Sequence, residues 1–227
     1  MSSLRARLRE PDMLIALAAG IGLLAYAARA AQLDALGFPL DDAWIHQTYA
    51  RNLVERGEWA FVPGQPSAAS TAPLYTLALA VGYIVRLPFF LWAFLFGALT
   101  LALGGWVARR LGAALFPDAR AAGLLTGLAA VTTWHLGGAA ASGMETSLFA
   151  TLSLVVVWLG GRLVFGPPVA AVRSGALLGL AGAALAGTRP EGAALFALTL
   201  ALALVGGQRE GRNLALGISA AVAVFAL

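Results

Sequence analysis

The stretch LYTLALAVGYIV, at residues 74–85, decides how the rest of this chain is arranged. It is mostly apolar and lies between Pro73 and Arg86. A helix that crosses a bilayer needs about 20 apolar residues, whereas a run of about 10–14 is more typical of a re-entrant or interfacial segment. If this stretch crosses a membrane, every later connection changes sides, so its assignment fixes the topology of the whole chain.

The composition makes lipid the expected solvent for most of the chain. Of the 227 residues, 60% are hydrophobic and 11% are charged, and the mean hydropathy is +0.82. Soluble domains have about 45–50% apolar and about 25% charged residues, so a soluble globule of this composition would lack the polar side chains to cover its surface. The same values exclude disordered and collagen-like chains. The absence of cysteine excludes a disulfide framework and thiolate chemistry.

The arginines decide between the two topologies. All 15 basic residues are arginine, and they lie singly or in pairs between apolar runs, which indicates membrane topology rather than nucleic-acid binding. If residues 74–85 span the bilayer, seven later arginines face outside; if these residues lie in the interface, the seven join Arg5, Arg7 and Arg9 inside. The second arrangement obeys the positive-inside rule. The seven are Arg109, Arg110, Arg120, Arg162, Arg173, Arg209 and Arg212.

We therefore predict an all-α transmembrane bundle of about seven spanning helices, with the N-terminus in the cytoplasm of an inner-membrane, multi-pass protein. Residues 1–227 form a single transmembrane domain, and residues 32–88 form its first outer loop, with an amphipathic and a juxtamembrane helix. The last apolar run stops at Leu227 without a polar tail, which predicts an N-terminal portion of a longer protein. The expected spans are residues 13–31, 88–108, 121–138, 146–161, 174–187, 193–206 and 213–227.

This topology brings three polar clusters to the outer face of the membrane. They lie at residues 41–42, at residues 143–146 and at residues 188–192. Ionisable groups near membrane depth are costly and indicate a functional site by default. The charge argument makes no use of chemistry, so the grouping of the three clusters is a separate indication of a site at the outer interface.

The first cluster is the pair Asp41 and Asp42, which precedes an amphipathic helical pattern. Asp41 suits an N-cap and Asp42 suits the positive end of a helix, so capping is one explanation of the pair. A catalytic pair of acids is the other, because the chain has few acids and these two follow a transmembrane segment directly. His46 lies one turn after Asp42 and is either an interfacial hydrogen-bonding residue or a group that binds a metal or tunes a base.

The other two clusters also allow a structural and a functional explanation. Glu145 begins a helix, where the helix dipole favours an acid. Arg189 and Glu191 flank Pro190 between two helices and form either a local ion pair or a site for a lipid phosphate, since guanidinium binds phosphate in a bidentate manner.

Several strings in these regions together resemble the N-terminal half of polytopic glycosyltransferases of the C-type fold. The nearest relatives are arabinofuranosyltransferase-like and mannosyltransferase-like proteins. The resemblance extends from the first helix to about residue 192 and rests on motifs that occur in order on one membrane face. The strings are DDAWIHQTYARNLVERGEW (41–59), FVPGQP (61–66), STAPLYTL (70–77), SGMETSLFA (142–150) and TRPEG (188–192).

The resemblance implies an inverting membrane glycosyltransferase that uses a polyprenyl-phosphate sugar donor. The acceptor is a hydroxyl group of a glycan, a lipid or a protein, and the general base is Asp42 or Asp41. For the same reaction we expect Arg189, or a divalent cation held by Glu145 and Asp42, to stabilise the leaving phosphate, and we expect Glu191 and His46 to belong to the substrate site. A transporter or flippase, or a non-catalytic membrane scaffold, is the alternative function; a transporter predicts acids near the bilayer midplane.

Overall fold

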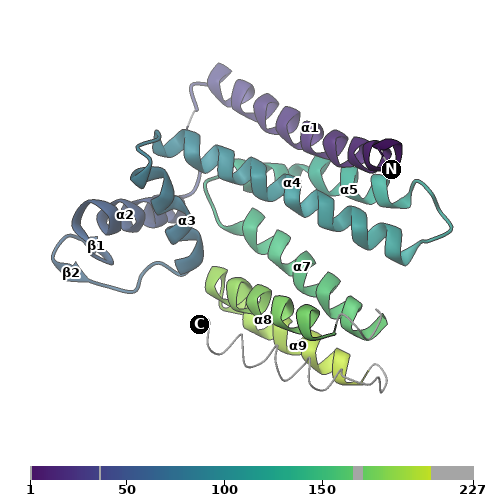
Figure 1. Cartoon of the computed structure of the whole chain (residues 1–227). Helices are drawn as coiled ribbons and strands as arrows, with labels where there is room; N and C mark the ends of the chain where they lie inside the picture. Colours follow the sequence, from purple (N-terminus) through teal and green to yellow (C-terminus); the bar gives the residue numbers. More distant parts are fainter. Residues whose placement is uncertain (1, 36, 166–170, 206–227) are drawn as a thin grey trace. The chain divides into compact units, whose positions relative to one another are not determined.

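A computed structural model describes residues 2–35, 37–165 and 171–205 of the chain, and over these ranges the fold is all-α with one small β-hairpin (Figure 1). The chain divides into two compact units, residues 1–70 with 75–151 and residues 71–74 with 152–227. The elements are α1 (Ser2–Gln32), α2 (Asp41–Arg56), β1 (Ala60–Val62), β2 (Gln65–Pro66), α3 (Pro73–Ile84), α4 (Phe89–Leu115), α5 (Ala122–Thr132), α6 (Trp134–Ala141), α7 (Thr146–Phe165), α8 (Ala171–Thr188) and α9 (Glu191–Val205).

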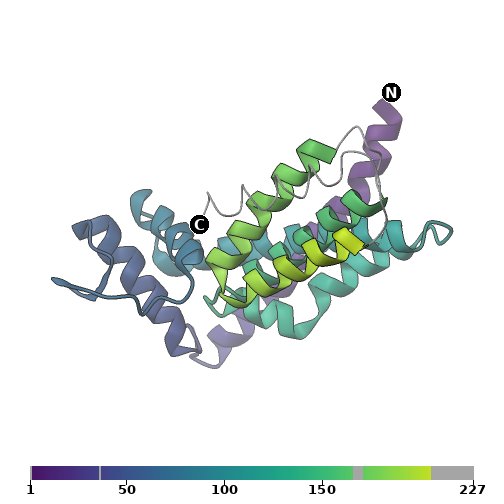
Figure 2. The ribbon, with the colours of Figure 1, turned by 90° about the horizontal axis from the view of Figure 1, so that it is seen from below.

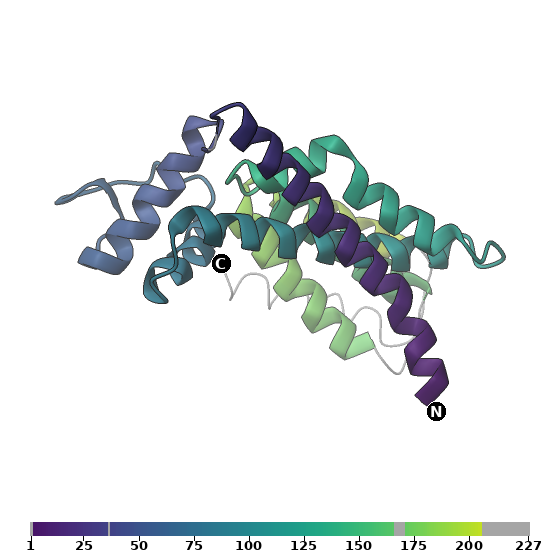
Figure 3. The same ribbon diagram turned by 90° about the horizontal axis from the view of Figure 1, so that it is seen from above.

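The core of the first unit lies where α1, α4 and α5 pack together. Figure 3 shows α1 crossing in front of α4 and α5. The fully buried Ile15 of α1 fits against Gly105 of α4 and Gly127 of α5, and a Cβ atom at either glycine would collide with its side chain. Small residues let helices approach closely where lipid surrounds them. The glycines of α4 and α5 therefore bring the three helices into close contact.

Helices α5 and α6 occupy the predicted span 121–138, but they are separated by a break at Thr133. The backbone of Thr133 is extended, with φ −64° and ψ 120°, so the helical hydrogen-bond ladder is interrupted. The hydroxyl groups of Thr132 and Thr133 donate to the carbonyl oxygens of Leu128 and Ala129 at 2.8 and 2.6 Å. The carbonyl of Ala129 also accepts the backbone N–H of Thr133 at 3.1 Å, so the two hydroxyls add side-chain bonds to the end of α5.

Helix α2, the hairpin and α3 gather at one end of the first unit (Figure 1). The side chain of Asn52 on α2 donates to the carbonyl oxygens of Ala60 and Phe61 at 2.9 and 3.2 Å. The hydroxyl of Tyr49 bonds to that of Ser67 at 2.5 Å. Several residues of the string DDAWIHQTYARNLVERGEW thus hold the hairpin against α2.

Helix α3 is 12 residues long, or about 18 Å. The hydrocarbon core of a bilayer is about 30 Å thick. The length of α3 therefore agrees with the prediction that residues 74–85 do not cross the membrane. The indole nitrogen of Trp92 on α4 donates to the carbonyl of Ala78 at 2.9 Å, which ties α3 to the start of α4.

In the second unit, α8 and α9 run side by side in opposite directions (Figure 2). Gly182 of α8 lies against the ring of Phe196 of α9, and Gly160 of α7 lies against Thr199 of α9. As in the first unit, glycines mark the points of closest helix approach.

The prediction of about seven spanning helices is wrong for the described part of the chain. Three of its helices are long and apolar enough to cross a membrane, Glu10–Gln32 within α1, Phe89–Leu115 and Thr146–Phe165. The break at Thr133 leaves α5 with 11 residues and α6 with 8, and α9 has 15. The predicted span 213–227 lies outside the described residues. Arg109 and Arg110 lie inside α4, which continues to Leu115, and not in a connection as predicted.

Candidate functional site

An aromatic cluster joins the connection between α1 and α2, the start of α2 and the start of α4. The ring of Phe38 contacts Trp44, Phe89 and Phe90, with ring centroids 5.2, 6.2 and 4.9 Å away. Gly143, in the turn before α7, has a φ of +75°, and a Cβ atom there would collide with Phe38. Only glycine suits both demands. The string SGMETSLFA is thereby anchored beside Asp41 and Asp42.

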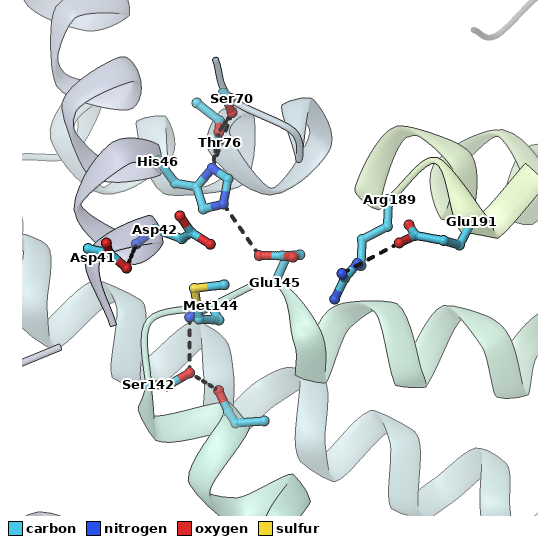
Figure 4. A network of polar contacts seen from close by, with 11 residues as sticks. Asp41, Asp42, His46, Ser70, Thr76, Ser142, Met144, Glu145, Arg189 and Glu191 are labelled. Atoms are coloured by element: carbon cyan, nitrogen blue, oxygen red, sulfur yellow. Dashed lines mark hydrogen bonds and ion pairs between the residues drawn. The ribbon is translucent and has the colours of Figure 1, made fainter. Parts of the chain in front are cut away.

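Beside this cluster, His46 and Glu145 form a buried pair (Figure 4). The Nε2 atom of His46 on α2 lies 3.4 Å from Oε2 of Glu145, and the two side chains are only 2% and 4% exposed. One of the two sequence interpretations of His46 paired it with Asp42, one turn earlier, but the acidic partner in the structure is Glu145, 99 residues further along the chain. Packing of α2 against the turn before α7 creates this contact.

Ser70 and Thr76 complete the surroundings of His46, and sequence reasoning missed both. The Nδ1 atom of His46 lies 3.1 Å from the hydroxyl of Ser70 and 3.4 Å from that of Thr76, and the two hydroxyls are 2.8 Å apart. Both residues belong to the string STAPLYTL. Because polar groups contact both ring nitrogens, the imidazole has a fixed orientation.

Tyr75 forms one wall around this pair. Its ring meets the His46 ring edge to face, with centroids 5.7 Å apart. Burial, and to a smaller degree the nearby Glu145 carboxylate, raise the pKa of Tyr75 well above its usual value of 10.0. The polar network therefore lies in a desolvated environment.

Asp41 and Asp42 occupy the exposed first turn of α2, and Leu40, not Asp41, is the N-cap residue. The backbone N–H of Asp42 donates to Oδ1 of Asp41 at 3.1 Å. Within the described residues, the carboxylate of Asp42 accepts no hydrogen bond, and Figure 4 shows its side chain on the same side of α2 as His46. The structure therefore distinguishes a locally engaged Asp41 from an Asp42 that is available to a reacting group.

Arg189 and Glu191 belong to the second unit. Their side chains form an ion pair at 3.6 Å across Pro190, and both are partly exposed, at 39% and 66% (Figure 4). This contact is the local ion pair that the sequence allowed. Their approach to the cluster of the first unit stays a prediction.

The donor set for a metal ion does not assemble in this region. Over the ranges that the structure describes, no three His, Asp or Glu side chains lie close enough together to bind a metal ion. Asp42 and Glu145, the predicted ligands, do not form such a group with His46. The divalent cation that Asp42 and Glu145 would hold therefore stays a prediction.

A large apolar cavity lies beside the acidic cluster, in the first unit. Its volume is about 910 Å³, within the range of ligand pockets. Leu40, which directly precedes Asp41, forms part of its wall, as do Met144 and Thr146, which flank Glu145. The remaining wall residues come from α1, from Pro39 and from the segment around α5 and α6: Ala18, Ile21, Gly22, Tyr26, Pro39, Val131, Thr132, Thr133, Trp134, His135, Gly137, Gly138, Ala139 and Ser142.

The cavity borders an exposed apolar side of α1. Ile21 and Trp134, on two sides of its wall, are 65% and 76% exposed. Ile21 lies in the middle of the first candidate span. The cavity therefore opens beside an exposed apolar part of a candidate membrane span.

No family model, no curated protein and no solved structure matches this chain, so the family suggested by its motifs stays a prediction.

Proposed function

We propose that this chain is the membrane part of an inverting glycosyltransferase. The enzyme transfers a sugar from a polyprenyl-phosphate donor to an acceptor hydroxyl on the outer face of the inner membrane. The observation that carries the proposal is the apolar cavity of about 910 Å³. Its wall includes Leu40, the residue directly before Asp41 and Asp42. A donor with a long apolar tail and a polar reacting end needs this combination of lipid-accessible cavity and adjacent acid.

Asp42 is the preferred general base. An acceptor O–H attacks the anomeric carbon of the donor, and a new carbon–oxygen bond forms as the bond to the phosphate oxygen breaks. The acceptor proton passes to the Asp42 carboxylate, and the polyprenyl phosphate leaves as an anion. Base catalysis of this kind contributes roughly 10²–10⁴-fold in rate. Asp41, which accepts a bond from the backbone of Asp42, orients the first turn of α2.

His46 and Glu145 act as positioning residues in this proposal. His46 lies one turn after Asp42 on the same helix, and its buried contact with Glu145 fixes α2 against the turn before α7. The pair therefore holds the base at the edge of the cavity. Arg189 is the candidate for stabilising the leaving phosphate, since it is partly exposed and its guanidinium can form paired bonds to phosphate oxygens.

The positions of the acids favour an enzyme over a transporter. Among the described residues, Glu10 and Asp12 lie within α1 at the beginning of its candidate span, and the other acids lie at helix ends or in connections. None of the described acids lies in the middle of a candidate span. A transporter coupled to ions would need ionisable groups near the bilayer midplane.

Transfer assays on membranes that contain the protein test the proposal. The donors are polyprenyl-phosphoryl arabinose and polyprenyl-phosphoryl mannose, each labelled in the sugar, and release of polyprenyl phosphate is measured with transfer of the label. We expect Asp42→Asn to reduce transfer at least about 100-fold. The matched control is Asp34→Asn, an exposed acid of the same loop whose left-handed backbone (φ 50°) suits asparagine. Retained transfer by the Asp41→Asn, Asp42→Asn double variant would contradict the proposal.

Cysteine labelling tests the topology independently of activity. The chain has no cysteine, so single cysteines beside Asp41, Glu145 and Arg189 would each be unique. All three should react with a membrane-impermeant thiol reagent from outside the cell. Labelling of one of them only from the cytoplasmic side would separate the clusters and overturn the shared site.

A further inference from the structure

A second, smaller cavity lies on the face of α2 that is turned away from His46. Its volume is about 140 Å³, and α2, α3 and α4 of the first unit all contribute to its wall. The α2 residues have the spacing of one helix face. The lining residues are Trp44, Gln47, Thr48, Arg51, Tyr83 and Phe89.

Gln47 presents a buried donor to this cavity. The residue is 4% exposed, and its Oε1 atom accepts a hydrogen bond from the hydroxyl of Tyr83 at 3.0 Å. This bond fixes the amide, so that the Nε2 group faces away from Tyr83. Within the described residues, Nε2 has no hydrogen-bond partner. A buried donor without an acceptor is unfavourable, and such exceptions call for an explanation.

Arg51 supplies positive charge at the mouth of the same cavity. It is exposed, and no carboxylate lies within ion-pair distance of it in the part of the chain that the structure describes. Burial raises the pKa of Tyr83, Arg51 opposes that rise, and Glu55 adds to it by less than Arg51 takes away. The positive charge of Arg51 therefore outweighs the nearby negative charge of Glu55 at this wall.

The polar groups of the cavity favour a ligand that accepts hydrogen bonds. The Nε2 group and the guanidinium can only donate, while the hydroxyls of Thr48 and Tyr83 already donate to the carbonyl of Trp44 and to Gln47. No carboxylate lines the cavity, so a sugar hydroxyl would find no strong acceptor there. The volume exceeds the about 30 Å³ share of one water molecule severalfold.

We infer that this cavity binds a phosphate group, with Arg51 and the Nε2 group of Gln47 as its donors. Arginine binds phosphate in a bidentate manner, and a neutral amide can donate to a third oxygen. The phosphate belongs either to a lipid headgroup or to a soluble phosphate ester. The site needs neither Asp42 nor the apolar cavity, so it stands apart from the proposed transfer reaction.

Two binding titrations on the purified full chain in detergent test the inference. The probes are inorganic phosphate and short-chain phosphatidic acid, and tryptophan fluorescence reports binding because Trp44 lies in the wall. We expect saturable binding of at least one probe, and Arg51→Gln should weaken it by about tenfold or more, the loss of one charge-assisted contact. The matched control is Arg56→Gln, an exposed arginine of the same helix outside the cavity, which should retain the affinity of the unchanged protein.

The two arms distinguish the sources of the phosphate. Binding of phosphatidic acid alone assigns the site to a lipid headgroup, and binding of both probes with similar affinity assigns it to a soluble phosphate ester. Gln47→Leu removes the buried donor without altering the charge and should weaken binding severalfold, with circular dichroism to show that the helices persist. Failure of both probes to saturate, or equal losses in Arg51→Gln and Arg56→Gln, would overturn the inference.

Discussion

The two ends of the first unit each carry one ion pair between distant parts of the chain, and the two pairs differ in their contact with water. At one end, Arg109 of α4 lies 3.2 Å from Asp12 of α1, with side chains 21% and 27% exposed. At the other, His46 and Glu145 are 2% and 4% exposed. A pair that water reaches contributes about 0–1 kcal/mol. Removing one partner of a buried pair costs about 3–5 kcal/mol.

The difference in exposure indicates different roles: the Asp12–Arg109 pair connects two helices, whereas the His46–Glu145 pair belongs to the candidate site. The Arg109 end needs only to hold two helices together, and the indole of Trp106 helps it by donating to the carbonyl of Asp12 at 2.7 Å. The His46 end places a desolvated carboxylate next to a histidine and adds the hydroxyls of Ser70 and Thr76. A hydrophobic contact would hold α2 as firmly at lower cost. The buried polar network therefore marks the end of the unit where function is expected.

The largest expected effect comes from Glu145→Ala. This variant leaves the buried His46 without its acidic partner, so we expect the free energy of unfolding in detergent to fall by about 3 kcal/mol. Asp12→Ala is the matched variant at the other end and should cost about 1 kcal/mol or less. Equal losses at the two ends would remove the distinction between them.

Gly143→Ala should have the next largest effect. Its φ of +75° is unfavourable for alanine, and the new Cβ atom would press against Phe38, so we expect a loss of about 2 kcal/mol. Gly57 has a similar φ of +70° but open space around it, so Gly57→Ala should cost about 1 kcal/mol. Thermal unfolding measures the loss of stability in each variant, and the difference between the two losses is the contribution of the Phe38 contact. Equal losses in the two variants would contradict this contribution.

The salt dependence of stability should also distinguish the two ion pairs, with a smaller effect than the two glycine variants show. The destabilisation caused by Arg109→Gln should be about 0–1 kcal/mol and should shrink as ionic strength rises, because exposed charges are screened. The loss caused by Glu145→Ala should change little over the same range, since buried pairs are screened much less. Parallel unfolding series at low and high salt test this, and a salt-sensitive Glu145 variant would show that water reaches the His46 pair.

The smallest effect at neutral pH is expected for Tyr75→Phe. Burial and the Glu145 carboxylate raise the pKa of Tyr75 in the folded state above 10.0. The raised pKa contributes stability that is fully present below pH 10 and is lost as the pH rises towards the folded-state value. The phenylalanine variant should therefore lose less stability above pH 10 than the unchanged protein does. Tyr26→Phe, at an exposed position on α1, is the control and should follow the unchanged protein.

The sequence predicted the features that depend on local pattern and charge. Composition indicated an all-α chain with apolar helices, and the length of residues 74–85 predicted a helix too short to cross a bilayer, in agreement with α3. The two acids of the 41–42 cluster fall in the first turn of a helix, as their position before an amphipathic pattern suggested. Each of these features is set within about one helix length of sequence.

The remaining features depend on packing between distant segments. Nothing near His46 in the sequence indicates that its partner is Glu145 and not Asp42, because tertiary packing brings the turn before α7 to α2. The break at Thr133 lies in an apolar run without proline, so periodicity predicted one span where there are two helices. The count of about seven spans failed for this reason and because α9 is shorter than a span.

The aromatic cluster around Phe38 has a consequence for depth. Indole rings favour the boundary between water and hydrocarbon, so in a bilayer Trp44 would hold this end of the molecule near that boundary. Trp44 of α2 and Phe89 of α4 contact each other, and both contact Phe38. Helix α2 therefore cannot change its depth in a bilayer unless α4 moves with it. The height of Asp41 and Asp42 above the lipid is thus set by where α4 begins, and one helical turn added there would lift the acids by about 5.4 Å.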